Sequence, residues 1–121
     1  MIIDDDKEIL AELKDFLVAK GYDTVTLDDT QYAVEISVDK KPDVILMDLK
    51  MPGKSGFELA DEISRSPELS NVPIIGMSGV FKDEYNGFMN LCGIKTYLKK
   101  PLDPEGMIAT IENAIGTKAG H

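Results

Sequence analysis

A chain of 121 residues is long enough to bury one hydrophobic core but too short for two domains, so we expect a single domain. Hydrophobic residues make up 43% of the chain and charged residues 29%, which excludes a disordered chain. With 13 basic and 22 acidic residues the formal net charge is −9, which argues against direct contact with nucleic acid, because phosphate contacts need clustered lysines and arginines.

Cysteine content and hydropathy limit where the protein acts. A single cysteine, Cys92, excludes an internal disulfide and favours a reducing compartment, so we expect a cytoplasmic protein. No apolar run approaches the ~20 residues needed to span a bilayer, and no basic-then-apolar signal opens the chain, so we expect no membrane association. Residues 1–116 are expected to form the domain, and 117–121 a tail that is disordered or left over from the expression vector.

Strand and helix patterns alternate along the chain. In chain order we expect a strand over 1–3, a helix over 6–20, a strand over 22–27, a helix over 30–38, a strand over 44–47, a helix over 57–64, a strand over 74–77, a helix over 82–91, a strand over 96–99 and a helix over 103–115. The apolar run 44–47 is typical of a strand covered on both faces. This order predicts an α/β fold of five βα units with right-handed parallel crossovers.

Two of these helices carry more specific expectations. In the second helix, the spacing of Tyr32, Ala33 and Ile36 predicts that these three side chains face inward. In the last helix, Asp103 is the expected N-cap and Pro104 the first helical residue.

Chemically distinctive side chains follow four of the predicted strands. In chain order they are Asp4, Asp5 and Asp6 after the first strand, Asp48 at the end of the third, Ser78 after the fourth, and Lys100 with Pro101 after the fifth. Open α/β sheets bind their ligands at the carboxyl ends of the strands, so we expect these groups to converge. A rigidly held carboxylate such as Asp48 can act as a nucleophile in phosphoryl transfer, and clustered carboxylates need a cation, for which Mg²⁺ is the natural choice.

Each of these residues also has an ordinary structural explanation. Asp6 is expected in the first turn of a helix, where its charge favours the helix dipole, rather than at the metal. Asp48 could instead cap a turn, Ser78 could cap a strand end, and Lys100 could be a solvated surface lysine. Only the combination of these residues favours a functional site.

Four segments resemble the motifs of response-regulator receiver domains, the CheY-like family of two-component signalling. The segment that resembles the phosphoacceptor motif is PDVILMDLKMPGKSG, and the one that resembles the acidic pocket is IIDDDKEI. The segment that resembles the hydroxyl-bearing strand is PIIGMSG, and the one that resembles the lysine–proline turn is YLKKPLDPE. The resemblance covers about residues 1–116. It implies a flavodoxin-like three-layer fold with a parallel five-stranded sheet in the order 2-1-3-4-5.

The resemblance also implies a phosphorylation site. Asp48 would accept a phosphoryl group from a histidine kinase or phosphotransfer protein. Mg²⁺ would be bound by Asp5 and Asp48, by Asp4 through water, and by the backbone carbonyl of Lys50. The chain would be a signalling switch rather than a metabolic enzyme, catalysing only its own phosphorylation and dephosphorylation.

The remaining motif residues would serve the same reaction and its readout. Ser78 and Lys100 would contact the transferring phosphoryl group, and the peptide bond before Pro101 would be cis. Tyr97 would move inward as Ser78 is drawn to the phosphate, which makes these two residues the expected switch. Phosphorylation would then change binding to a downstream effector protein or output domain, or the phosphate would be relayed onward.

Three other functions share parts of this pattern. An aspartate-nucleophile phosphohydrolase uses the same groups, but it usually has a second aspartate where this chain has Lys50. A flavin-binding electron carrier needs a hydroxyl- and glycine-rich phosphate loop, whereas Asp4, Asp5 and Asp6 would repel the phosphate of its cofactor. A receiver that binds partners without phosphorylation is disfavoured by the complete set of residues.

Overall fold

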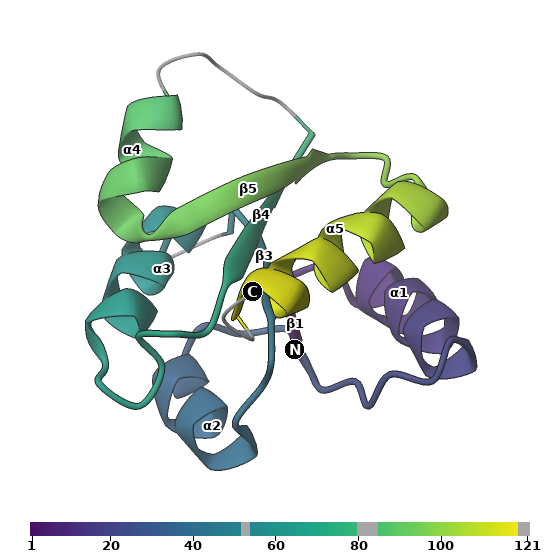
Figure 1. Ribbon diagram of the computed structural model, residues 1–121, viewed down its shortest axis with the longest axis horizontal. Coiled ribbons are helices and arrows are strands. Elements are labelled where there is room, and N and C mark those ends of the chain that lie inside the picture. The colour runs from purple at the N-terminus through teal and green to yellow at the C-terminus, as the bar shows by residue number, and fades with distance from the viewer. Residues whose placement is uncertain (52–53, 80–84, 119–121) are drawn as a thin grey trace.

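The computed structural model describes residues 1–51, 54–79 and 85–118. Within these ranges one parallel sheet has the strand order β2-β1-β3-β4-β5, and five helices cover its two faces (Figure 1). The elements are β1 (Ile2–Ile3), α1 (Lys7–Ala19), β2 (Thr26–Leu27), α2 (Ala33–Lys40), β3 (Ile45–Asp48), α3 (Gly56–Arg65), β4 (Ile74–Ser78), α4 (Tyr85–Cys92), β5 (Ile94–Lys99) and α5 (Pro104–Lys118). This confirms the flavodoxin-like fold and the expected sheet order.

The sheet is buried between two helical layers. Helices α1 and α5 cover one face, and α2, α3 and α4 cover the other (Figure 1). Successive side chains of a strand point to opposite faces. Ile2 and Leu46 therefore pack with α1 and α5, whereas Ile3 and Met47 pack with the other layer. Because both faces are covered, every residue of β3 and β4 is buried, which for β3 confirms the expectation from the apolar run 44–47.

The second βα unit differs most from the prediction. The strand expected over 22–27 is reduced to Thr26–Leu27, because β1 offers only Ile2 and Ile3 for pairing. Tyr32 was expected to face inward, but it is 64% exposed and precedes α2 with a φ of 65°. The prediction for Tyr32 was wrong, since the buried residues of α2 are Ala33 and Ser37, one helical turn apart.

Element boundaries differ elsewhere by a few residues. Strand β5 begins at Ile94, two residues earlier than expected, and α5 continues through Thr117 and Lys118, which were expected in the tail. The cap of α5 is as predicted: the Gly106 amide donates to Asp103 Oδ2 at 3.1 Å. Several expectations fall outside the described residues: Pro52, Gly53, the start of the fourth helix at Lys82, and 119–121. Among the described helices, none combines the length and apolarity required to cross a bilayer.

A glycine lets α3 begin close to the end of β3. Gly56 is the first residue of α3, and its amide donates to the Leu49 carbonyl at 3.3 Å. A Cβ added to Gly56 would overlap the Asp48 carbonyl oxygen and would lie 2.7 Å from Leu49 Cα. Only glycine therefore permits α3 to begin directly against the backbone that carries Asp48.

We expect Gly56→Ala to lower the free energy of unfolding by about 2 kcal/mol or more, because the neighbouring atoms are backbone and cannot rotate away. Urea unfolding followed by circular dichroism measures the change. Gly116→Ala is the matched control: nothing lies within 4 Å of its added Cβ, so stability should stay the same or rise. Equal stability of the Gly56→Ala variant and the wild type would contradict the close approach.

Candidate functional site

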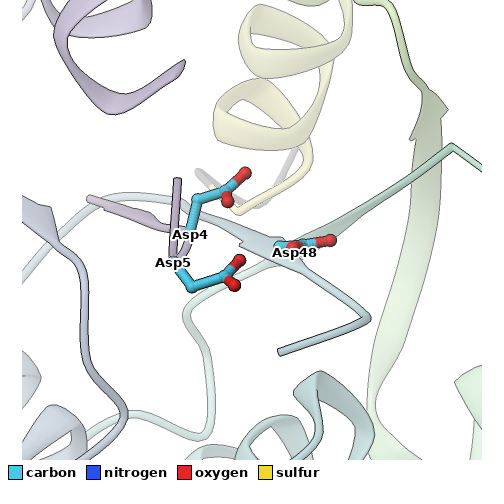
Figure 2. A group of neighbouring side chains, drawn as sticks. All are labelled: Asp4, Asp5 and Asp48. Carbon is cyan, nitrogen blue, oxygen red and sulfur yellow. The ribbon is translucent and has the colours of Figure 1, made fainter. Parts of the chain in front are cut away.

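Three aspartates gather where β1 and β3 end. Asp4 and Asp5 follow β1, and Asp48 is the last residue of β3, the strand that pairs with β1 (Figure 2). One carboxylate oxygen from each residue lies within 4.8 Å of the others. Asp4 and Asp48 are buried and Asp5 is exposed. The structure thus brings together the three side chains that the resemblance implied as metal ligands.

Lys100, the residue after β5, brings a positive charge to this cluster. Its Nζ donates to Asp4 Oδ2 at 2.8 Å and lies 3.6 Å from Asp48 Oδ1. The Lys100 amide donates to the Ser78 carbonyl at 2.8 Å, which continues the β4–β5 ladder beyond its last residue. The Lys100–Pro101 peptide bond is cis, as expected. The side chain of Lys100 therefore bridges Asp4 and Asp48.

Backbone amides orient two of the carboxylates, which the sequence patterns did not indicate. The Asp6 amide donates to Asp4 Oδ1 at 2.9 Å, and the Lys50 amide donates to Asp48 Oδ1 at 3.3 Å. The side chain of Asp6 is the N-cap of α1, because its Oδ1 accepts a hydrogen bond from the Glu8 amide at 2.9 Å. Asp6 thus lies at the cap position rather than in the first turn.

Ser78 and Tyr97 lie on the two strands that follow β3 in the sheet. Ser78 is the last residue of β4, is 1% exposed, and follows Met77, the register partner of Asp48. Tyr97 lies in β5 opposite Gly76 and is 40% exposed. Ser78 therefore lies at the same end of the sheet as the aspartates. Tyr97 precedes Leu98, the β5 residue that pairs with Met77, and so lies one position further from that end.

Charge and burial oppose each other at the site. Burial raises the pKa of Asp48 above its ordinary value of 3.8, and Asp4 raises it further, although Lys100 and the Lys50 amide act in the opposite direction. Burial alone would lower the pKa of Lys100, but its hydrogen bond to Asp4 and the charges of Asp4 and Asp48 raise it. Among the described residues, three carboxylates gather here and Lys100 pairs with two of them, Asp4 and Asp48, so the cluster retains unbalanced negative charge. Hard oxygen donors with excess negative charge fit Mg²⁺.

The raised pKa of Asp48 predicts a pH dependence of stability without metal. Below 3.8, the ordinary pKa, Asp48 is protonated in both the folded and unfolded states, and its contribution to stability is fully present. That contribution is lost as the pH rises through the raised pKa. We therefore expect the difference between the free energies of unfolding of the wild type and of Asp48→Asn to fall from acidic to neutral pH. A chelator keeps both proteins free of metal in this comparison.

Urea unfolding of both proteins over a pH series measures this difference. The comparison with Asp48→Asn removes the titration of the other carboxylates, which both proteins share. A difference that stays constant with pH would show that Asp48 titrates alike in the folded and unfolded states.

A hollow on the described part of the chain lies away from these residues. It has a volume of about 1050 Å³ and is lined by residues that include Pro73, Gly93 and Thr110. Pro73 and Gly93 immediately precede β4 and β5, so the hollow opens at the amino ends of these strands. The aspartate cluster lies at the opposite, carboxyl ends.

Comparison with known proteins identifies the family of the chain. Residues 1–112 match the family model described as the response regulator receiver domain. The protein PilH of Pseudomonas aeruginosa is 30% identical over 95% of this chain and 94% of its own length. The phosphate regulon transcriptional regulatory protein PhoB of the same organism is 33% identical over 93% of this chain, but this chain spans only 49% of PhoB.

The fold is shared with solved structures. Chemotaxis protein CheY4 of Vibrio cholerae superposes with a TM-score of 0.89 at 25% identity, over 93% of this chain and 94% of that chain. A CheY-like receiver domain protein of Methanospirillum hungatei superposes with a TM-score of 0.88 at 22% identity, over 98% of this chain and 94% of that chain. With its fold, its acidic cluster and the family match over residues 1–112, the chain belongs to the receiver domains of two-component response regulators, signalling switches that are phosphorylated on an aspartate.

Proposed function

We propose that Asp48 is the phosphoacceptor of this receiver domain. The observation that carries the proposal is the convergence of the carboxylates of Asp4, Asp5 and Asp48 within 4.8 Å of one another, with Lys100 bridging Asp4 and Asp48. Of the three, Asp48 is the residue that ends a central, fully buried strand. Its carboxylate is therefore held in position by the sheet, as a nucleophile requires.

Asp48 attacks the phosphorus of a phosphohistidine in the partner protein. The phosphorus–oxygen bond to Asp48 forms as the phosphorus–nitrogen bond breaks, and the histidine ring leaves with the electron pair of that bond. Water later attacks the same phosphorus, which releases inorganic phosphate and restores the Asp48 carboxylate. Positioning and neutralisation of charge supply most of the catalysis in such loose transition states.

The other residues of the site serve this transfer. Asp4, Asp5, Asp48 and the Lys50 carbonyl would hold Mg²⁺, which supplies positive charge against the phosphoryl oxygens. Lys100 already lies 3.6 Å from Asp48 Oδ1 and would pair with a phosphoryl oxygen after transfer. The Ser78 hydroxyl would donate to another oxygen, and Tyr97, now 40% exposed, would follow Ser78 inward.

The partners follow from this chemistry. The phosphoryl donor would be a histidine kinase or a phosphotransfer protein in the cytoplasm, and the readout would be altered binding to an effector or output domain, or onward transfer. The relatives differ in length: this chain spans 94% of PilH but about half of PhoB. We propose a switch that catalyses no metabolic reaction.

Incubation with acetyl phosphate and Mg²⁺ tests this function against that of a phosphohydrolase. A receiver should gain the mass of one phosphoryl group and lose it slowly, whereas p-nitrophenyl phosphate should not be turned over. Steady turnover of the phosphomonoester would instead favour the phosphohydrolase. Lys50 stands where that class has its second aspartate, so we expect labelling without turnover.

A further inference from the structure

Gly76 interrupts an otherwise fully packed strand. It lies in the middle of β4, and its neighbours Ile75 and Met77 are both 0% exposed. A glycine inside a strand weakens it and often marks the close approach of another group. Such a position in the central part of a buried sheet therefore needs a local explanation.

The group that approaches Gly76 is the side chain of Leu49. A Cβ added to Gly76 would lie 3.1 Å from Leu49 Cδ2, 3.2 Å from Cδ1 and 3.3 Å from Cγ. Leu49 is 1% exposed, and its amide donates to the Met77 carbonyl at 2.9 Å. Leu49 is also bonded directly to Asp48 in the chain. The side chain next to the phosphoacceptor thus fills the space that Gly76 leaves.

On its other side Gly76 adjoins Tyr97. The register of β4 and β5 pairs these two residues, and paired residues project from the same face of a sheet. Leu49 packs in the core on the face covered by α2, α3 and α4. Leu49, Gly76 and Tyr97 therefore follow one another across that face, from the end of β3 to the edge strand β5.

We infer that Gly76 is a positioning residue of the phosphoryl switch, because its missing side chain lets Leu49 transmit displacements at Asp48 to Tyr97. This inference rests on the proposed function of Asp48 and deepens it. The core is close-packed, so Leu49 cannot move without changing the space above Gly76. With a methyl group on residue 76, Leu49 must give way by a few tenths of an ångström, and its backbone carries that shift to Asp48.

The test compares Gly76→Ala with Gly87→Ala. Gly87 lies in α4, is exposed, and has nothing within 4 Å of an added Cβ, so it is a matched control. The probes are acetyl phosphate with Mg²⁺, and the NMR signals of ring-labelled tyrosine, with the Tyr97 signal assigned from a Tyr97→Phe variant. The labelling rate and the melting temperature are measured for each protein. The Tyr97 signal is measured before and after phosphorylation.

We expect all three measured quantities to change in Gly76→Ala and none to change in Gly87→Ala apart from a small gain in stability. The melting temperature should fall by about 5 °C, as overpacking of a core predicts. The Tyr97 signal should shift without phosphorylation, and its response to phosphorylation should fall by about half or more. Labelling should slow by about tenfold, because a small displacement of a positioned nucleophile is costly.

A second substitution separates transmission from simple destabilisation. Leu49→Ala removes the three atoms that crowd residue 76, so Gly76→Ala in that background should cause no further change in the Tyr97 signal, and the two effects should be non-additive. A Gly76→Ala variant that melts earlier but keeps the wild-type Tyr97 signal and labelling rate would overturn the inference. So would equal effects of Gly76→Ala with and without Leu49.

The two proposals fail in different ways. A wild-type protein that takes no label would refute the proposed function of Asp48. A wild-type protein that is labelled normally, beside a Gly76→Ala variant with an unchanged Tyr97 signal, would refute only the role of Gly76.

Discussion

Asp48→Asn should reduce phosphoryl labelling by acetyl phosphate by at least about 1,000-fold, since an amide oxygen cannot replace the attacking carboxylate. The fold should survive, because asparagine has nearly the same shape as aspartate. Burial and Asp4 already raise the pKa of Asp48, so a neutral side chain suits this position in the absence of metal. Intact-protein mass spectrometry measures the label, and thermal unfolding tests the fold.

Asp15→Asn is the matched control for this substitution. Asp15 is exposed on α1 and loses the same charge, so its variant should be labelled at the wild-type rate. Peptide mapping of the labelled wild type should place the phosphoryl group on Asp48. Undiminished labelling of Asp48→Asn, or a label on Asp4 or Asp5, would mean that another aspartate is the nucleophile.

Millimolar Mg²⁺ should raise the melting temperature of the protein. In the described part of the chain, oxygens of three carboxylates lie within 4.8 Å of one another while Lys100 pairs with only Asp4 and Asp48, so a bound divalent cation removes repulsion that only the folded state contains. At a metal concentration of about 100 times Kd the gain is about 2.7 kcal/mol. For a domain of this size this corresponds to a rise of roughly 8–12 °C. Differential scanning fluorimetry against a chelator measures it.

Neighbouring aspartates provide the control for the metal. Asp5→Asn removes a proposed ligand and should shrink the Mg²⁺-dependent rise, whereas Asp6→Asn should preserve it. The Asp6 side chain caps α1 through the Glu8 and Ile9 amides, and asparagine caps helices equally well. The same shift in both variants, or no shift in the wild type, would contradict a metal site at Asp4, Asp5 and Asp48.

Local patterns were sufficient to predict much of this protein. The alternation of strand and helix signals predicted the βα order, because periodicity reports which faces of each element are buried. Motif order predicted the convergence of Asp4, Asp5, Asp48 and Lys100, because the carboxyl ends of parallel strands share one edge. The cap at Asp103 also followed from sequence, since capping depends on residues only a few positions apart.

Contacts between distant residues required the folded chain. Lys100 bonds Asp4 more closely than Asp48, and Tyr32 is exposed rather than buried, as a result of how strands and helices pack. The contact of Gly76 with Leu49 joins the middle of β4 to the residue after β3, and no spacing along the chain encodes it. Sequence periodicity describes one element at a time, whereas these distances depend on the register and packing of several elements together.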